Sequence, residues 1–136
     1  MRWIDRKKAI QLHGSSARNL QTVHGGKLVS TSSHRVIATR HLAYAFKDDP
    51  TRRAFTVCIH EPFHVEEGSV DFNVSGWTSG CFISFDGLQE KKMTIYGADA
   101  IQALELAVQD VEHCLRRLSK KKYDFYFDDG EPYFED

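Results

Sequence analysis

The sequence predicts a single α+β domain, an antiparallel sheet of about five to six strands with one long helix packed on one face. Three observations predict this fold. Strand patterns occupy residues 36–96 and one helix follows, a grouping that favours α+β over a wound α/β fold. The helix is amphipathic and needs a surface to cover. A chain of 136 residues, 41% of them apolar, can build one core but is short for two.

Alternating apolar and polar residues mark the strands. We expect them at residues 36–46, 53–60, 70–74, 81–85 and 92–96, with a last strand after the helix at 123–127. Turn residues separate them, such as Lys47 to Pro50 and the pair Asp86-Gly87, which favours positive φ. Pro62 ends the second strand because it has no N–H group to give to the ladder.

The helix is the clearest element of the sequence. It follows Gly97, and we expect it from Asp99 to Ser119. Asp99 and Gln102 have the spacing of a capping box, although Gly97 is an alternative N-cap. Six apolar residues recur at spacings of three and four and should form the stripe that covers the sheet: Ile101, Leu104, Val108, Val111, Leu115 and Leu118.

The two ends of the chain differ from the predicted domain at residues 36–127. Residues 11–35 are rich in small polar side chains, so we expect residues 1–35 to be a flexible leader. The composition changes abruptly at Val36. An alternative is therefore that residues 1–35 are misannotated upstream sequence and that translation starts there from a GUG codon. Residues 128–136 should be a frayed acidic tail.

Charge and cysteine content limit the class of protein. Residues 1–46 hold eight Lys or Arg against one acid, and residues 47–136 hold ten against eighteen. The basic leader allows nucleic-acid binding as an alternative, but the basic cluster is short and the rest of the chain is acidic. Three widely spaced cysteines indicate reduced thiols. No apolar run approaches the roughly 20 residues that cross a bilayer. We therefore expect a cytoplasmic protein without a membrane partner.

A block at the start of the helix resembles a known family. Residues 97–107 read G-x-D-x-x-Q-A-L-x-L-A and are similar to a block in small uncharacterised bacterial proteins that share a domain of unknown function. Residues 36–40 are similar to the opening strand of that family, and the resemblance covers roughly residues 36–127. It implies a bacterial protein and supports this fold, but no activity. Two departures are the absence of a counterpart for residues 1–35 and a longer region at residues 67–80.

One group of residues has the chemistry of a metal site. Cys58, His60 and His64 form a C-x-H-x3-H array, in which Cys58 and His60 point to one face of a strand. Zinc would need a further ligand from Cys81, Glu66 or Glu67. Because the spacing matches no standard site, we interpret Cys58 as a small apolar residue and the histidines as solvent-facing. A small enzyme or metal-binding protein that uses this region remains an alternative.

Other candidate sites have simpler structural explanations. A nucleophile pair would need Cys81 or Cys114 beside a histidine, but Cys114 falls on or near the apolar stripe of the helix and should be a buried thiol. No Gly-rich phosphate-binding motif is present in the sequence. We therefore predict no catalytic residue and no cofactor.

The leading hypothesis is a non-enzymatic protein-binding module. Aromatic residues gather among acids near the C-terminus, and Tyr133 and Phe134 would be partner-binding anchors if they stay exposed. An acidic surface with such anchors would suit a basic protein partner. The oligomeric state does not follow from the sequence.

Overall fold

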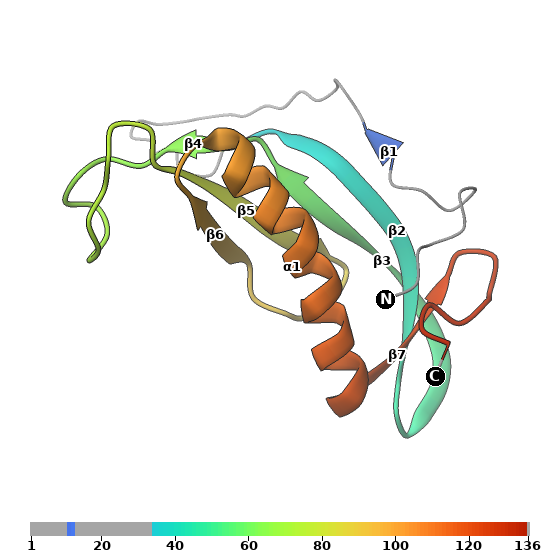
Figure 1. Cartoon of the computed structure of the whole chain (residues 1–136). Coiled ribbons are helices and arrows are strands. Elements are labelled where there is room, and N and C mark those ends of the chain that lie inside the picture. The colour runs from blue at the N-terminus through green and yellow to red at the C-terminus, as the bar shows by residue number, and fades with distance from the viewer. Residues whose placement is uncertain (1–10, 13–33, 136) are drawn as a thin grey trace, which may run out of the picture.

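The structure, a computed structural model, describes residues 11–12 and 34–135. Its described part forms one antiparallel sheet with a long helix across one face (Figure 1), which confirms the predicted α+β fold. The strands are β1 (Gln11–Leu12), β2 (Val36–Phe46), β3 (Asp49–His60), β4 (Phe63–His64), β5 (Ser79–Asp86), β6 (Met93–Gly97) and β7 (Tyr123–Phe127), and the helix is α1 (Ala100–Lys121).

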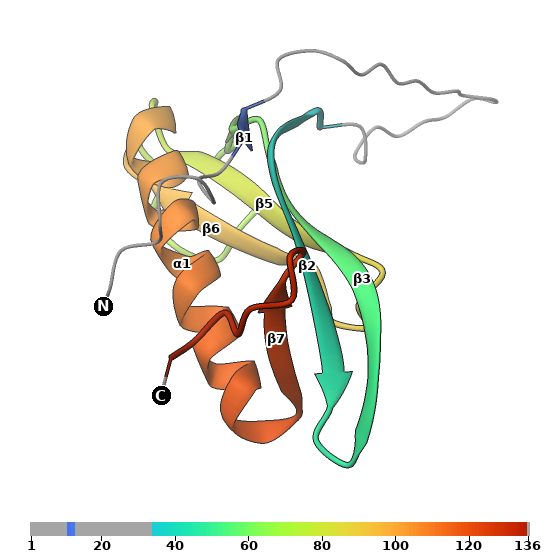
Figure 2. The same ribbon diagram turned by 90° about the vertical axis from the view of Figure 1, so that its right-hand side faces the viewer.

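Four strands form a meander that the helix closes. β2, β3, β5 and β6 follow one another in the sheet, and β4 extends the β3 side of β5. α1 then carries the chain from β6 back across the sheet, so that β7 pairs with the second half of β2 (Figure 2). β1 pairs with the first half of β2, where Gln11 lies opposite Thr39. β6 and β7 thus stand on opposite sides of the meander.

The core lies between the sheet and α1. Strand alternation turns one set of side chains toward the helix, including Leu42, Val57 and Ile83, and these are almost fully buried. The helix buries Ala103, Ala107, Val111, Cys114, Leu115 and Leu118. Burial of apolar surface on this scale is the main term that holds such a domain together.

The predicted helix stripe is partly wrong. Val111, Leu115 and Leu118 are buried as expected, but the side chain of Ile101 is 78% exposed and that of Val108 is 43% exposed. α1 starts so close to the sheet that a Cβ atom on Gly97 would lie 2.4 Å from the backbone nitrogen of Ala103. Small side chains therefore take the inner face in the first half of the helix, and larger ones are left outside.

The predicted capping box is confirmed. Asp99 is the N-cap, and its carboxylate accepts a hydrogen bond from the Gln102 N–H at 2.8 Å. The Gln102 side chain reaches back and accepts from the Ala98 N–H at 2.7 Å, one residue earlier than in the standard box. The bond from the Gln102 N–H satisfies a donor that the start of a helix leaves unpaired, and the bond from the Ala98 N–H ties down the residue before the N-cap.

Two further predictions are wrong. Residues 70–74 alternate in polarity but form no strand; they belong to a loop closed by the bond from the Val65 N–H to the Thr78 oxygen at 2.9 Å. The described part of the tail, residues 128–135, is not frayed. It folds back on β7, where Tyr126 bridges Pro132 and the Tyr133 N–H donates to the Phe125 oxygen at 2.9 Å.

Most of the predicted leader lies outside the described residues, and so does its basic cluster, on which the nucleic-acid alternative depended. Within the described part, Gln11 and Leu12 add a short strand to the sheet. No helix in that part combines the length and apolar content that a membrane span requires.

Candidate functional site

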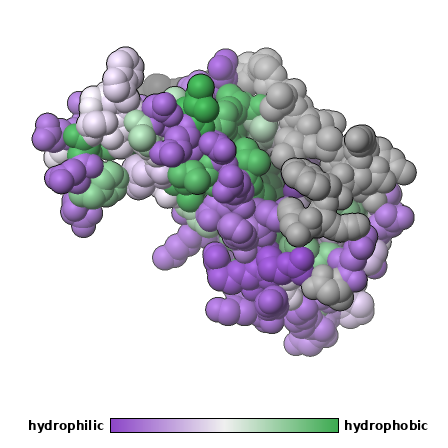
Figure 3. All heavy atoms as spheres, viewed as in Figure 1, coloured by the Kyte–Doolittle hydropathy of each residue, from purple (hydrophilic) through white to green (hydrophobic). Residues whose placement is uncertain are grey.

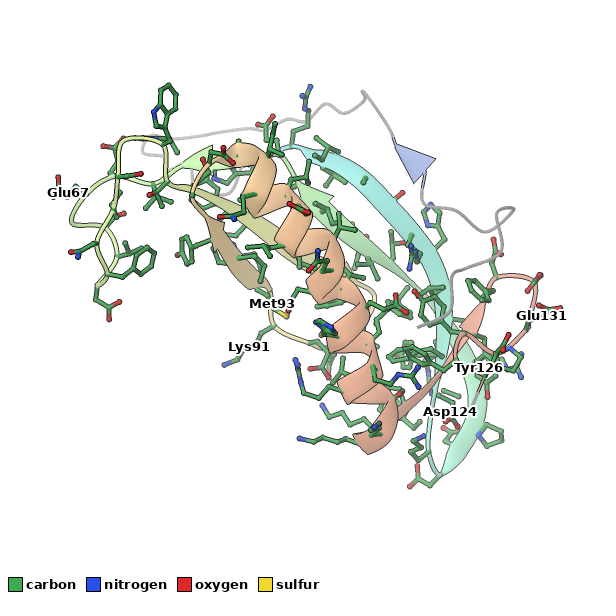
Figure 4. The ribbon with its side chains drawn as sticks, in the orientation of Figure 1. Glu67, Lys91, Met93, Asp124, Tyr126 and Glu131 are labelled. Atoms are coloured by element: carbon green, nitrogen blue, oxygen red, sulfur yellow. The ribbon has the colours of Figure 1, made fainter. Side chains whose placement is uncertain are left out.

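The predicted metal candidates do not converge into one set of ligands among the described residues. Cys58 and His60 share the sheet face away from α1, as strand alternation predicted. His64 is exposed on β4, and a carboxylate oxygen of Glu66 is 3.9 Å from its Nε2 atom. Glu67 lies on the outer part of the loop after β4 (Figure 4). Among the residues that the structure describes, no three His, Cys, Asp or Glu side chains gather as metal ligands.

Cys81 lies on the opposite face from Cys58. It is fully buried in the core under α1, and its thiol donates to the backbone oxygen of His60 at 3.2 Å. Burial raises the pKa of Cys81 to about 11, so the thiol stays protonated and unreactive near neutral pH. The predicted structural role of Cys114 is also supported, because this thiol is buried within the helix face of the core.

Both ring nitrogens of His60 are engaged. Nδ1 lies 2.8 Å from the backbone oxygen of His34, and Nε2 lies 2.8 Å from the Ser84 hydroxyl. A carbonyl oxygen can only accept, so Nδ1 carries the hydrogen; in the neutral ring Nε2 then accepts from Ser84. This order of hydroxyl, imidazole and orienting oxygen is that of an activated serine. The spacing of 24 residues between His60 and Ser84 gave no sequence signal.

An aromatic cluster covers one side of His60. His34, Phe63 and Phe82 form this back-face cluster, with ring centroids 4.7–5.0 Å apart. Gly80 permits it, because a Cβ atom there would lie 2.5 Å from the Phe63 ring. Burial lowers the pKa of the His34 imidazole, which favours its neutral form among these rings. The Phe82 ring of this cluster lies edge-on to the His60 ring at 6.4 Å and contributes to the partial burial of His60.

The predicted partner-binding residues pack against the domain. Tyr133 is 7% exposed, and its hydroxyl donates to a Glu112 carboxylate oxygen at 2.8 Å and accepts from the Arg40 guanidinium. Phe134 is partly buried, and the Arg116 guanidinium lies 4.1 Å from the centre of its ring. The exposure on which this prediction depended is therefore absent at Tyr133. Its burial was not visible in the sequence, because Arg40 and Glu112 are 93 and 21 residues away.

A pocket lies between the end of α1 and the folded tail. Its lining includes the cations Lys47, Arg116 and Lys120. Lys47 is paired with Asp124 at 2.7 Å, and Arg116 stacks on Phe134. The protein's own groups therefore hold two of the three cations, so the pocket is a weak candidate for an anion site.

Apolar side chains outside the core occur in two regions that sequence reasoning missed. Near β6, Phe72 packs against Tyr96, and Trp77 is exposed on the turn before β5. The helix flank comprises the exposed Ile101 and Val108 and the partly buried Leu104. Figure 3 shows that hydrophobic residues gather around the first half of α1, whereas the second half is mostly hydrophilic. The turn residues Ser75 and Gly76 directly before Trp77 were the sequence signal for the exposed turn.

No family model, no curated protein and no solved structure matches the chain.

Proposed function

We propose that the protein is a protein-binding module that takes up an extended segment of a partner protein beside β6. The observation that carries this proposal is Trp77, whose large apolar side chain is 78% exposed on an ordered turn. Tryptophan is among the residues most enriched at the energetic centres of protein interfaces. An anchor that is already held in place loses little conformational entropy when a partner covers it.

Hydrogen bonds within residues 75–79 hold the turn that presents Trp77. The Ser75 N–H donates to the Thr78 hydroxyl at 2.9 Å, and the Thr78 N–H donates to the Ser75 oxygen at 3.3 Å. The Trp77 N–H donates to the Ser75 hydroxyl at 3.3 Å, and the Ser79 hydroxyl donates to the Trp77 oxygen at 3.0 Å. The backbone of the turn is thus fixed on both sides of the indole.

β6 offers the second contact. It pairs with β5 along one edge, and no strand of the described residues pairs with its other edge. Its sequence, Met-Thr-Ile-Tyr-Gly, contains neither the charges nor the proline that commonly protect a free edge. Tyr96 packs edge-on against Phe72 with ring centroids 5.0 Å apart. A partner strand could pair with this edge and place side chains against the two rings.

The register of the sheet brings these features together. Ser79 lies opposite Gly97, so the Trp77 turn stands at the end of β6 that carries Tyr96. Residues 61–79 contain four acids and no Lys or Arg. A partner segment with apolar side chains and a net positive charge therefore fits this surface best.

The test compares two serine substitutions at equally exposed apolar residues, one inside the proposed binding site and one outside it. Immobilised protein is exposed to a display library of short random peptides, and the selected peptides are then measured against Trp77→Ser and Ile101→Ser. Both side chains are 78% exposed, so neither change should unfold the domain. We expect selection of basic, apolar peptides, with affinity at least about tenfold weaker for Trp77→Ser only. Equal binding by both variants, or no selection, would contradict the proposal.

A second candidate function, hydrolysis at Ser84, has the support of one observation. His60 Nε2 lies 2.8 Å from the Ser84 hydroxyl while its Nδ1 atom is held by the His34 oxygen, an arrangement in which His60 can act as base. A fluorophosphonate probe tests this role. Labelling of Ser84 that disappears in His60→Gln would favour it, and absence of labelling in the unmodified protein would count against it.

A further inference from the structure

The helix flank belongs to a line of apolar side chains along α1. These side chains are largely exposed to solvent in the first half of the helix and buried in the second half. Ile101, Leu104 and Val108 follow one another at spacings of three and four, and Leu115 continues the same line seven residues later. Leu115 is fully buried, whereas Ile101 and Val108 are exposed. Glu112, one turn after Val108, contacts Arg40 at 3.5 Å, so the flank is turned toward β2.

The Gln11 end of β1, where residues 1–10 join the chain, lies near this flank. β1 is antiparallel to β2, with Gln11 opposite Thr39 and Leu12 opposite Ala38, so Arg40 lies beyond the Gln11 end of β1. From Leu42 onward the same edge of β2 is taken by β7, which begins its pairing at Phe127. The length of this edge that neither β1 nor β7 occupies is therefore short and lies near Arg40, which contacts Glu112 of α1. Ten residues span up to about 33 Å when extended, whereas the flank is roughly 10 Å long.

The chemistry of residues 1–10 complements the flank. The segment MRWIDRKKAI contains Trp3, Ile4 and Ile10 together with four cations and one acid. The exposed side of the flank carries the acids Glu105 and Glu112. Arg40 adds an independent observation, because its Nε atom is buried without a hydrogen-bond partner among the described residues. A buried donor of this kind is costly to leave unpaired, and a backbone carbonyl of the arriving segment could accept from it.

We propose that residues 1–10 dock along the helix flank, with Trp3 as the apolar anchor and the cations toward the acids of α1. The N-terminal segment is then an intramolecular ligand of the helix. This docking is separate from the proposed binding at β6 and does not depend on it.

The experiment uses Trp3 as the reporter. The chain has two tryptophans, so Trp77→Phe leaves Trp3 as the sole indole. In this background, acrylamide quenching of Trp3 is measured without further change and with Ile101→Asp. The matched control is Leu106→Asp, because Leu106 is 36% exposed on the opposite side of α1. We expect Ile101→Asp to raise the quenching constant roughly twofold and Leu106→Asp to leave it unchanged, since docking shields one face of the indole.

Each alternative outcome overturns the docking proposal. Full accessibility of Trp3 before any change at the flank would show that the segment is not docked. Equal effects of the two aspartate substitutions would place Trp3 elsewhere. Shielding that is lost on dilution, with a dimer mass at high concentration, would make a second copy of the chain the occupant. Circular dichroism melting confirms that each variant is folded, which is expected because Ile101 is exposed.

Discussion

Removing the Tyr133 hydroxyl tests whether the C-terminal segment is an integral part of the fold. Tyr133→Phe keeps the buried ring and deletes one group, which bonds the Glu112 carboxylate at 2.8 Å and the Arg40 guanidinium. Hydrogen bonds to charged partners contribute about 1.5–3 kcal/mol each. Arg40 and Glu112 also contact each other at 3.5 Å, so each charged group still has one partner after the hydroxyl is removed. We therefore expect a loss of about 2 kcal/mol rather than the sum of two bonds.

The measurement is urea unfolding followed by circular dichroism, in which the midpoint shifts while the slope stays constant. Heating gives a second readout, with a decrease of about 4–8 °C for each kcal/mol in a domain of this size. Tyr126→Phe is the matched control. Its ring stacks with the Arg52 guanidinium at 3.6 Å and needs no hydroxyl for that contact, so its stability should change by less than about 0.5 kcal/mol.

Equal stability of Tyr133→Phe and Tyr126→Phe would refute this reasoning, because it would mean that residues 128–135 do not fold with the sheet. A double-mutant cycle with Glu112→Gln sharpens the result. If the hydroxyl acts through Glu112, the two changes together should cost less than the sum of their separate effects by about 0.5–3 kcal/mol.

Three further predictions test the helix start and the core. Gly97→Ala should lose about 1–3 kcal/mol of unfolding free energy, because the new Cβ would meet the Ala103 backbone, whereas Gly76→Ala has open space around it and should be neutral in the same urea assay. Asp99→Ala should lower the free energy of unfolding by about 1 kcal/mol, measured by thermal melting. Asp99→Asn should retain most of the stability, because asparagine also caps helices. Burial, with the bond to Glu90, raises the pKa of Tyr123 to about 12 from 10.0. Its contribution to stability is complete below pH 10 and lost as the pH rises to 12, so the alkaline fall in melting temperature should be smaller in Tyr123→Phe.

The elements of the fold could be predicted because their signals are local. The capping residues Asp99 and Gln102 lie three positions apart, and their hydrogen bonds form within one helical turn. Strand alternation identified β2, β3, β5, β6 and β7 for the same reason. It also predicted a strand at residues 70–74 that does not form. Alternation reports which side chains could share a face, but a strand also needs a neighbour whose backbone groups pair with it.

The buried face of α1 depends on a distance that the sequence does not contain. Hydrophobicity favours Ile101 and Val108 over Ala103 and Ala107 for the core, and that ranking is right for a helix at the usual separation from a sheet. The chain turns directly from β6 into α1 at Gly97, which brings the first turns of the helix close to the strands. At that separation only small side chains fit, so the alanines are buried and the larger residues form the open helix flank.

The candidate sites were hard to predict because their parts come from distant positions. The array of Cys58, His60 and His64 suggested metal ligands, but the hydroxyl and the carbonyl that hold the His60 ring belong to Ser84 and His34. Tyr133 suggested an exposed anchor because its neighbours in the sequence are acidic. In the structure, Arg40 of β2 donates a hydrogen bond to the Tyr133 hydroxyl, and the side chain is buried. Trp77 shows the reverse. The hydrogen bonds that form its turn do not involve the indole, and the side chain is exposed to solvent. Exposure of a large apolar residue therefore points to a binding surface only after the fold has shown which residues already have partners.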